Sequence, residues 1–177
     1  MLGITLSSRY SIIRHLGGGG FAQTYLAEDS QLPGNHLCVV KQLKPQATDP
    51  ETLQVARRLF DTEAQVLYKL GNHDRIPRLF AYFEENQEFY LVQEFIEGHD
   101  LSQEITPASP GTGGVMQEDK VICILQELLE ILDFVHQQNV IHRDVNPRNI
   151  LRRYRDNKLV LIDFGAVKEI TTQITNP

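Results

Sequence analysis

The alternation of apolar and polar positions predicts two long helices. Between Pro50 and Leu70, apolar or small residues recur every three or four positions, the spacing of one face of an α-helix. Asp49 before this segment is a typical start signal, and Gly71 after it is a typical stop. A second helix is predicted from Glu118 to Gln138, where apolar residues cover so broad a face that burial on more than one side is expected.

Shorter apolar runs, each bounded by turn-forming residues, predict strands. These runs are Tyr10–Leu16, Thr24–Ala27, Leu37–Leu43, Leu79–Phe83, Phe89–Ile96 and Leu159–Ile162. The first two flank the four glycines Gly17–Gly20, so they predict a hairpin whose tip carries no side chains. Bare backbone N–H groups at such a tip can close over phosphate oxygens, although four glycines alone indicate a flexible hairpin more often. The tip is not a Walker A loop, because no Gly-Lys-Ser/Thr follows it.

Three oxygen-bearing side chains follow apolar runs in the second half of the chain. Asp144 and Asn149 come after Val140-Ile141, and Asp163 comes directly after the short branched run that ends at Ile162. A carboxylate that leaves the end of a buried strand ahead of a glycine is expected at a cleft rather than in a core. Oxygen ligands of this kind suit Mg²⁺, whose coordination is usually completed by phosphates and water.

Glu63 lies on the apolar stripe of the first predicted helix. An unpaired carboxylate facing a core is strongly unfavourable, so a buried Glu63 needs a cationic partner. Lys41, the one charge in its apolar strand, is the obvious candidate. From the helix alone, a position at the wet edge of the stripe is an equally good interpretation.

Composition narrows the class of protein. The chain has 177 residues, of which 41% are hydrophobic and 23% charged, which suits a globular core. A formal net charge of −6 argues against nucleic acid as the main partner. Cys38 and Cys123, each within an apolar run, are predicted to be small buried side chains in a reducing compartment. No membrane span or signal peptide is expected, so the prediction is a cytoplasmic protein.

The motifs of the second half resemble those of one family. His142-Arg143-Asp144, with Asn149 at the right offset and Asp163-Phe164-Gly165 beyond, resembles the catalytic and metal loops of eukaryotic-like protein kinases. The fragment HRDV-x-P-x-NIL resembles bacterial serine/threonine kinases in particular. The resemblance implies that Asp144 orients the hydroxyl of a protein substrate, and that Asn149 and Asp163 hold Mg²⁺. It also implies that Lys41 binds the phosphates of ATP, and it favours pairing between Glu63 and Lys41.

The same resemblance implies the residues that surround ATP. They are Leu16, Gly17, Gly18, Gly19, Gly20, Phe21, Thr24, Val39, Lys41, Gln93, Glu94, Ile96 and Asp100. Ala22 stands where the family has its third loop glycine, which is costly only if that position needs a positive φ. Gln93 takes the gatekeeper position, and the backbone of Glu94 and Ile96 is expected to hydrogen-bond adenine. Asp100 is expected either to bind the ribose or to cap a helix.

The expected fold is α+β, a protein-kinase-like architecture with two lobes. Residues 1–95 form an N-lobe of antiparallel sheet plus one helix, and residues 96–177 form a partial, mostly helical C-lobe with ATP between the lobes. Relative to the family the chain is truncated in the activation segment, and the missing packing is expected to leave an apolar patch on the second long helix.

One departure from the family bears on function. Serine/threonine kinases carry Lys two positions after the catalytic Asp, where this chain has Asn146, which supplies no charge to the γ-phosphate. The main hypothesis is an ATP- and Mg²⁺-dependent protein kinase in which Asp144, Lys41, Glu63 and Asn146 form the catalytic set. The alternative is a truncated or pseudokinase-like module that binds nucleotide without turnover. A small-molecule phosphotransferase is disfavoured by Arg143 and Gly165.

Overall fold

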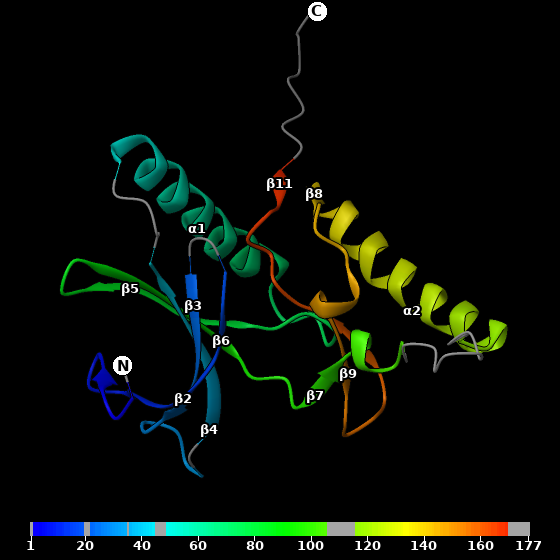
Figure 1. Ribbon diagram of the computed structural model, residues 1–177, viewed down its shortest axis with the longest axis horizontal. Helices are drawn as coiled ribbons and strands as arrows, with labels where there is room; N and C mark the ends of the chain where they lie inside the picture. Colours follow the sequence, from blue (N-terminus) through cyan, green and yellow to red (C-terminus); the bar gives the residue numbers. More distant parts are fainter. Residues whose placement is uncertain (1, 20–21, 35, 45–48, 106–115, 170–177) are drawn as a thin grey trace, which may run out of the picture. The chain divides into compact units, whose positions relative to one another are not determined.

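The computed structural model describes residues 2–19, 22–34, 36–44, 49–105 and 116–169 (Figure 1). The chain divides into two compact units. The first unit comprises Met1–Gly71 and Pro77–Phe95, and the second comprises Asn72–Ile76 and Ile96–Pro177. The first unit has one sheet and the second has two, and each unit has its own long helix.

The first unit is built on a six-stranded antiparallel sheet of order β1-β2-β3-β4-β6-β5. Its strands are β1 (Thr5–Leu6), β2 (Tyr10–Gly18), β3 (Ala22–Asp29), β4 (His36–Leu43), β5 (Leu79–Glu85) and β6 (Glu88–Glu94). Asn86 and Gln87 join β5 to β6 with φ of 53° and 66°, the left-handed values of a two-residue hairpin turn. The sequence predicts five of these strands with shifted ends, and it misses β1, which is too short to show a period.

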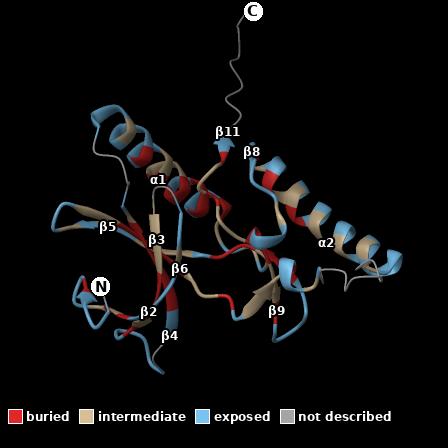
Figure 2. Cartoon of the chain, in the orientation of Figure 1, coloured by how far each residue is buried: buried red, intermediate tan, exposed pale blue. Residues whose placement is uncertain are grey.

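Helix α1 (Pro50–Leu70) has the predicted bounds. The Asp49 carboxylate accepts a hydrogen bond of 2.8 Å from the backbone N–H of Thr52, and the helix ends at Gly71 with φ of 62°. One side of the helix is buried (Figure 2). Its buried side chains lie mostly on the predicted apolar stripe and include Glu63, and Val66 beside the stripe is buried as well. Tyr82 of β5 contacts α1 in two ways. Its ring packs against Phe60, and its hydroxyl group donates a hydrogen bond to Asp61.

The two faces of the sheet have different partners. Alternate residues of the strands form one core on the face away from α1, a cluster made up of Leu6, Tyr10, Ile12, Tyr25, Ala27, Cys38, Val40, Tyr90 and Val92.

 Val39 and Lys41 of β4 alternate with this cluster and therefore lie on the face that α1 covers. Burial raises the pKa of the Cys38 thiol to about 12, so this cysteine behaves as a small apolar side chain.

A partly buried ion pair joins Arg9, the residue before β2, to the end of β3. Arg9 donates from Nε and Nη2 to the two carboxylate oxygens of Asp29, at 2.8 and 2.6 Å, and Asp29 is only 1% exposed. The backbone N–H of Gln31 donates to the same carboxylate at 3.1 Å. The Arg9 hydrogen bonds are the main reason that the pKa of Asp29 lies below its usual value, against the opposing effect of burial.

Asp29→Asn is expected to destabilise the protein by about 2 kcal/mol at pH 7, because a charge-assisted pair becomes a neutral one. The lowered pKa means that the stabilisation is present above the unfolded-state pKa of about 4 and is lost as the pH falls through the folded-state pKa. Urea unfolding at pH 7 and near pH 3 measures both effects. A difference between variant and wild type that does not shrink at the lower pH would contradict the assignment.

The second unit combines helix α2 (Glu118–Gln137) with short strands. Two small antiparallel sheets have the orders β10-β9-β7 and β11-β8. The strands and 3-10 turns are β7 (Gly98–Asp100), η1 (Leu101–Gln103), β8 (Val140–Ile141), η2 (Pro147–Asn149), β9 (Ile150–Arg153), β10 (Leu159–Leu161) and β11 (Lys168–Glu169). Of these strands the sequence predicts β10 alone, and places its end one residue late.

Helix α2 forms as predicted, but its expected burial on more than one side is wrong. It packs on β8 and β10, and of its residues Ile131 and Val135 are buried. Ile122, Leu125 and Leu129 are 44, 51 and 63% exposed, which is the apolar patch that the sequence predicts for this helix. Cys123 is also exposed, contrary to prediction, because it lies beside these residues on α2.

Within the described ranges, no helix is long and apolar enough to cross a membrane.

Candidate functional site

The first unit contains a buried ion pair between β4 and α1. The Nζ atom of Lys41 lies 2.5 Å from Oε1 of Glu63, and the two side chains are 11 and 4% exposed. Lys41 is held in a central strand, paired with Thr24 on β3 and Leu91 on β6. The predicted pairing is therefore present, and the interpretation of Glu63 as a residue at the wet edge of α1 is wrong. At this separation and burial the interaction is a charge-assisted hydrogen bond that fixes the ammonium group.

The strands of the glycine-rich hairpin extend further toward its tip than predicted, with register shifts between Ile12 and Arg14 and between His15 and Gly17. Its strands stay paired as far as Gly18 and Gln23, and Gly19 N–H donates to the Ala22 carbonyl at 2.9 Å. Ala22 lies in β3 and is not among the described residues with positive φ, so its methyl group causes no backbone strain. A Cβ atom on Gly17 or Gly19 would meet no atom within 4 Å, so the backbone there is open to a ligand.

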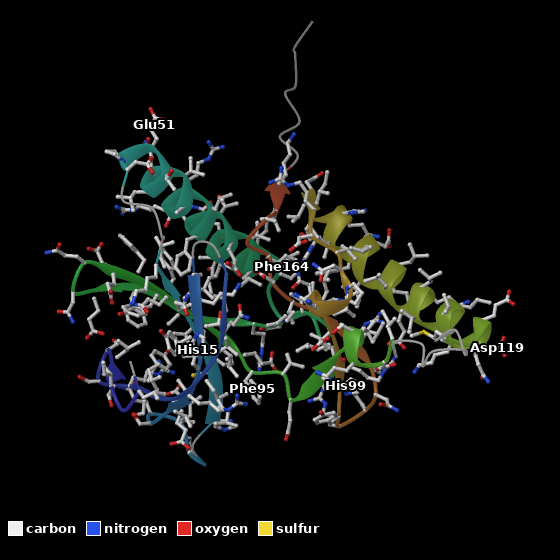
Figure 3. The ribbon with its side chains drawn as sticks, in the orientation of Figure 1. His15, Glu51, Phe95, His99, Asp119 and Phe164 are labelled. Carbon is white, nitrogen blue, oxygen red and sulfur yellow. The ribbon has the colours of Figure 1, made fainter. Side chains whose placement is uncertain are left out.

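Two further contacts define this hairpin. The His15 ring nitrogen Nε2 lies 2.7 Å from Oε1 of Gln23, and the His15 ring meets Tyr25 edge-on (Figure 3). These contacts tie β2 to β3 below the tip. Gly20 and Phe21, which are expected to close over the phosphates, lie outside the described residues.

The residues expected around adenine are divided between the two units. Val39 and Gln93 are neighbours across β4 and β6, and they are 8 and 6% exposed. Glu94 N–H donates to the Arg78 carbonyl at 2.9 Å, so this donor is already used within the sheet. Leu16 is in β2 of the first unit, whereas Ile96 and Asp100 belong to the second unit.

Asp100 takes the capping role that the sequence leaves open. Its carboxylate accepts hydrogen bonds from the backbone N–H and hydroxyl of Ser102, and from Nε2 of Gln103 at 2.9 Å. The hydrogen bond from the Ser102 side chain is the largest cause of a lowered pKa of Asp100. Both oxygens therefore have partners in η1.

In the second unit, His142 links the loop after β8 to the end of β10. Its Nδ1 accepts from Asp144 N–H at 3.3 Å, and its Nε2 lies 3.1 Å from the Ile162 carbonyl. Because Nδ1 accepts, Nε2 carries the proton and donates it to that carbonyl. The ring is 1% exposed and meets Phe164 edge-on at 4.7 Å between centroids (Figure 3).

The carboxylate of Asp144 is held by side-chain amides. Asn149 Nδ2 donates to Oδ2 of Asp144 at 2.8 Å and to its carbonyl at 2.9 Å. Asn146 Nδ2 donates to Oδ1 at 3.0 Å. Both oxygens of the carboxylate are thus oriented by neutral donors from the same loop.

Asn149 and Asp163 are brought together by the backbone. Ile162 N–H donates to the Asn149 carbonyl at 2.9 Å, directly beside the pairing of β9 with β10. Asp163 follows Ile162 with φ of 62°, and Arg143 has φ of 65°. Left-handed backbone at residues other than glycine concentrates at functional sites, because the surrounding structure must stabilise it.

The donor set of this loop fits Mg²⁺. Because Nδ2 of Asn149 donates to Asp144, the oxygen Oδ1 is the atom of that amide left to bind a cation. Together with the Asp163 carboxylate it supplies hard oxygen ligands, and Mg²⁺ needs only one or two from the protein when phosphates and water complete its shell. Among the residues that the structure describes, no group of three or more His, Cys, Asp or Glu forms a different metal site.

Sequence reasoning missed the contacts of Asn146 and Asn149 with Asp144. Asn146 followed by Pro147 is a typical N-cap and first helical position, so the sequence contains a signal for the start of η2. That signal does not indicate the contact with Asp144. Arg143, the residue before Asp144, donates from Nε to the Ala166 carbonyl at 2.6 Å.

Comparison with known proteins places these features in one family. A family model described as the protein kinase domain matches residues 10–176. Serine/threonine-protein kinase B of Synechocystis sp. is 50% identical over 165 residues, which cover 93% of this chain and 28% of that protein. Serine/threonine-protein kinase PknA of Nostoc sp. is 46% identical over 172 residues, or 97% of this chain and 30% of that protein.

A solved structure agrees with these relatives. The crystal structure of a double mutant of the Mycobacterium tuberculosis PknI kinase domain superposes with a TM-score of 0.72 at 28% identity. The match covers 93% of this chain and 61% of that one. The chain therefore has the α+β protein-kinase-like fold that the sequence predicts, and it spans about 30% of the length of the two curated relatives named above.

Proposed function

The chain belongs to the protein kinase family, and we propose that it carries the ATP-binding and catalytic residues of a serine/threonine kinase. The reaction is transfer of the γ-phosphoryl group of ATP to a hydroxyl group of a protein. The observation that carries the proposal is a pair of hydrogen bonds at Asn149, whose side-chain amide donates to the Asp144 carboxylate and whose backbone carbonyl accepts from Ile162 N–H. These bonds join the loop of the candidate base and one candidate metal ligand, Asn149, to the segment that carries the other, Asp163.

Asp144 is the group that receives or orients the proton of the substrate hydroxyl. Its two amide partners fix the plane of the carboxylate, so the remaining lone pairs keep one direction. A base held in place loses little entropy when the hydroxyl arrives.

Lys41 binds the α- and β-phosphates of ATP, and Glu63 holds its ammonium group in position. Asn149 Oδ1 and the Asp163 carboxylate hold the metal ion. When bound, Mg²⁺ neutralises the negative charge of the phosphates as that charge is redistributed in the transition state. The open backbone at Gly17 and Gly19 is assigned to the phosphates, together with Gly18, Gly20 and Phe21 of the same loop.

The remaining candidate residues are assigned to the binding of adenine and ribose. Thr24, Val39, Leu16 and Gln93 line the adenine, and the backbone of Glu94 and Ile96 hydrogen-bonds it. For Glu94 this is the carbonyl, since its N–H is bonded to Arg78. Asp100 binds the ribose by exchanging its Gln103 partner for a hydroxyl. In this proposal, residues 1–95 form the N-lobe and residues 96–177 form the partial C-lobe. The proposal also assigns the chain to the cytoplasm.

A second candidate function is a regulatory module that binds ATP without turnover. The position that follows Asp144 by two residues carries Asn146, whose amide adds no positive charge to a reaction driven by electrostatic stabilisation. The two functions share nucleotide binding and differ in transfer.

The test takes the purified chain with Mg²⁺ and ATP. At about 100 times the dissociation constant, bound nucleotide stabilises a protein by about 2.7 kcal/mol, which corresponds to a rise in Tm of about 5–10 °C. Excess EDTA should reverse most of the rise. Radiolabelled ATP with generic protein acceptors then measures transfer. Stabilisation without transfer would favour the regulatory module, and no stabilisation would reject both functions.

A further inference from the structure

Asn146 uses its whole side-chain amide within the loop. Its Oδ1 accepts from Arg148 N–H at 2.9 Å and caps η2, while Pro147 occupies the first position of that turn. Its Nδ2 lies 3.0 Å from Oδ1 and 3.2 Å from the carbonyl oxygen of Asp144. The Oδ1 acceptor of Asn146 therefore stabilises η2, and its Nδ2 donor points back to Asp144.

The carboxylate of Asp144 consequently lies between two amides. Asn149 holds Oδ2 and Asn146 holds Oδ1, so rotation about the last side-chain bond breaks both hydrogen bonds. With Asn149 alone, the planar carboxylate could pivot about its one side-chain hydrogen bond at Oδ2, and Oδ1 would move with that rotation. The second amide therefore removes the remaining rotational freedom.

We propose that Asn146 is a positioning residue, which fixes the Asp144 carboxylate for transfer and does not bind the γ-phosphate. The inference rests on the proposed function. A charged residue at this position would contact the γ-phosphate. In Asn146, the Nδ2 atom that would reach a phosphate is instead hydrogen-bonded to Asp144. Recruiting it to phosphate would release the carboxylate that it orients.

Asn146→Ser separates these roles. Serine is as good an N-cap as asparagine, so η2 keeps its cap, while the amide donor to Asp144 is lost. The expected result is a fall in kcat of roughly ten- to hundredfold with the KM for ATP unchanged. Calorimetric affinities for Mg-ATP and Mg-ADP should also be unchanged. Asn72→Ser, at an exposed asparagine of the second unit, is the matched control and should leave kcat at the wild-type value.

Two results would overturn the proposal. One is a wild-type kcat in Asn146→Ser. The other is a loss of ATP affinity without loss of ADP affinity, because that difference reports contact with the γ-phosphate. If the serine variant does not fold, Asn146→Asp keeps the cap and sets a carboxylate against Asp144, so it should also lower kcat.

A measurement without nucleotide distinguishes failure of this inference from failure of the proposed function. In ¹H–¹⁵N spectra, the side-chain amide signals of Asn146 are those that vanish in Asn146→Ser. They should shift in Asp144→Ala, whose side chain no longer accepts the hydrogen bond. Unmoved signals would reject the Asn146–Asp144 contact, whether or not the wild-type protein transfers phosphate. Shifted signals in a protein without transfer would keep the contact and reject the proposed function.

Discussion

Asp144→Asn is expected to lower the rate of phosphoryl transfer by roughly 10²–10⁴-fold, the contribution of a positioned general base. The amide has nearly the shape of the carboxylate, and one oxygen remains to accept a hydrogen bond. It has no charge, and its NH₂ group cannot accept the hydroxyl proton. Asn149 keeps its bond to the backbone carbonyl of residue 144, so the loop should retain its fold.

The measurement is initial transfer rate under saturating Mg-ATP, with Tm in the absence of nucleotide as the check on folding. Asp119→Asn removes the same charge from an exposed position at the start of α2 (Figure 3) and is the matched control. It should transfer at the wild-type rate. If Asp144→Asn kept more than about a tenth of the activity, Asp144 would not be the base.

How much the sequence predicts depends on the length of each element. Helix α1 was predicted to the residue because 21 residues display a clear stripe and both ends carry capping signals. Strands β7, β8, β9 and β11 have two to four residues, too few to show an alternating period. Their pairing depends on residues distant in the chain, such as Gly98 opposite Arg153.

Burial is harder to predict than helix formation. The apolar residues of α2 correctly predict a helix, yet Leu129 is 63% exposed, because burial depends on which elements lie against each side. Glu63 illustrates the opposite case. A carboxylate on an apolar stripe needs a partner, and Lys41 was the available cation, but a position at the wet edge was an equally good interpretation until the resemblance to protein kinases favoured the pair.

The candidate site residues could be selected from the sequence, but most of their contacts could not. Asp144, Asn149 and Asp163 stand out by their positions after apolar runs. The amide bonds to Asp144 could not be read from the sequence, because they depend on how η2 turns the side chains of Asn146 and Asn149. The kinase motifs identify the candidate residues, and the conformation of η2 determines which atoms the side chains of Asn146 and Asn149 contact.

Lys41→Met is expected to destabilise the first unit by about 3–5 kcal/mol, the cost of breaking a buried ion pair from one side. The variant leaves the Glu63 carboxylate, 4% exposed, without its 2.5 Å ammonium contact. Glu63→Leu should cost a similar amount, because the buried Lys41 ammonium then loses its 2.5 Å contact with the Glu63 carboxylate. Urea unfolding monitored by circular dichroism gives both free energies.

The double variant Lys41→Met/Glu63→Leu should recover most of the stability lost by either single variant, since two apolar side chains of similar volume replace the charges. Arg78→Met is the matched control. It breaks an ion pair with Glu94 whose side chains are 49 and 29% exposed, and it should cost less than about 1 kcal/mol. Single variants no more costly than this control would contradict the burial of the pair.

The same double variant separates stability from function. Its fold should be nearly as stable as the wild type, but no ammonium group remains to bind the phosphates of ATP. If Lys41 acts only in folding, the double variant should bind Mg-ATP as the wild type does. If it binds phosphate, recovery of stability should come with a loss of the nucleotide-induced rise in Tm. The second result is expected, because a buried and pre-oriented charge is a costly feature for a protein to keep without a ligand.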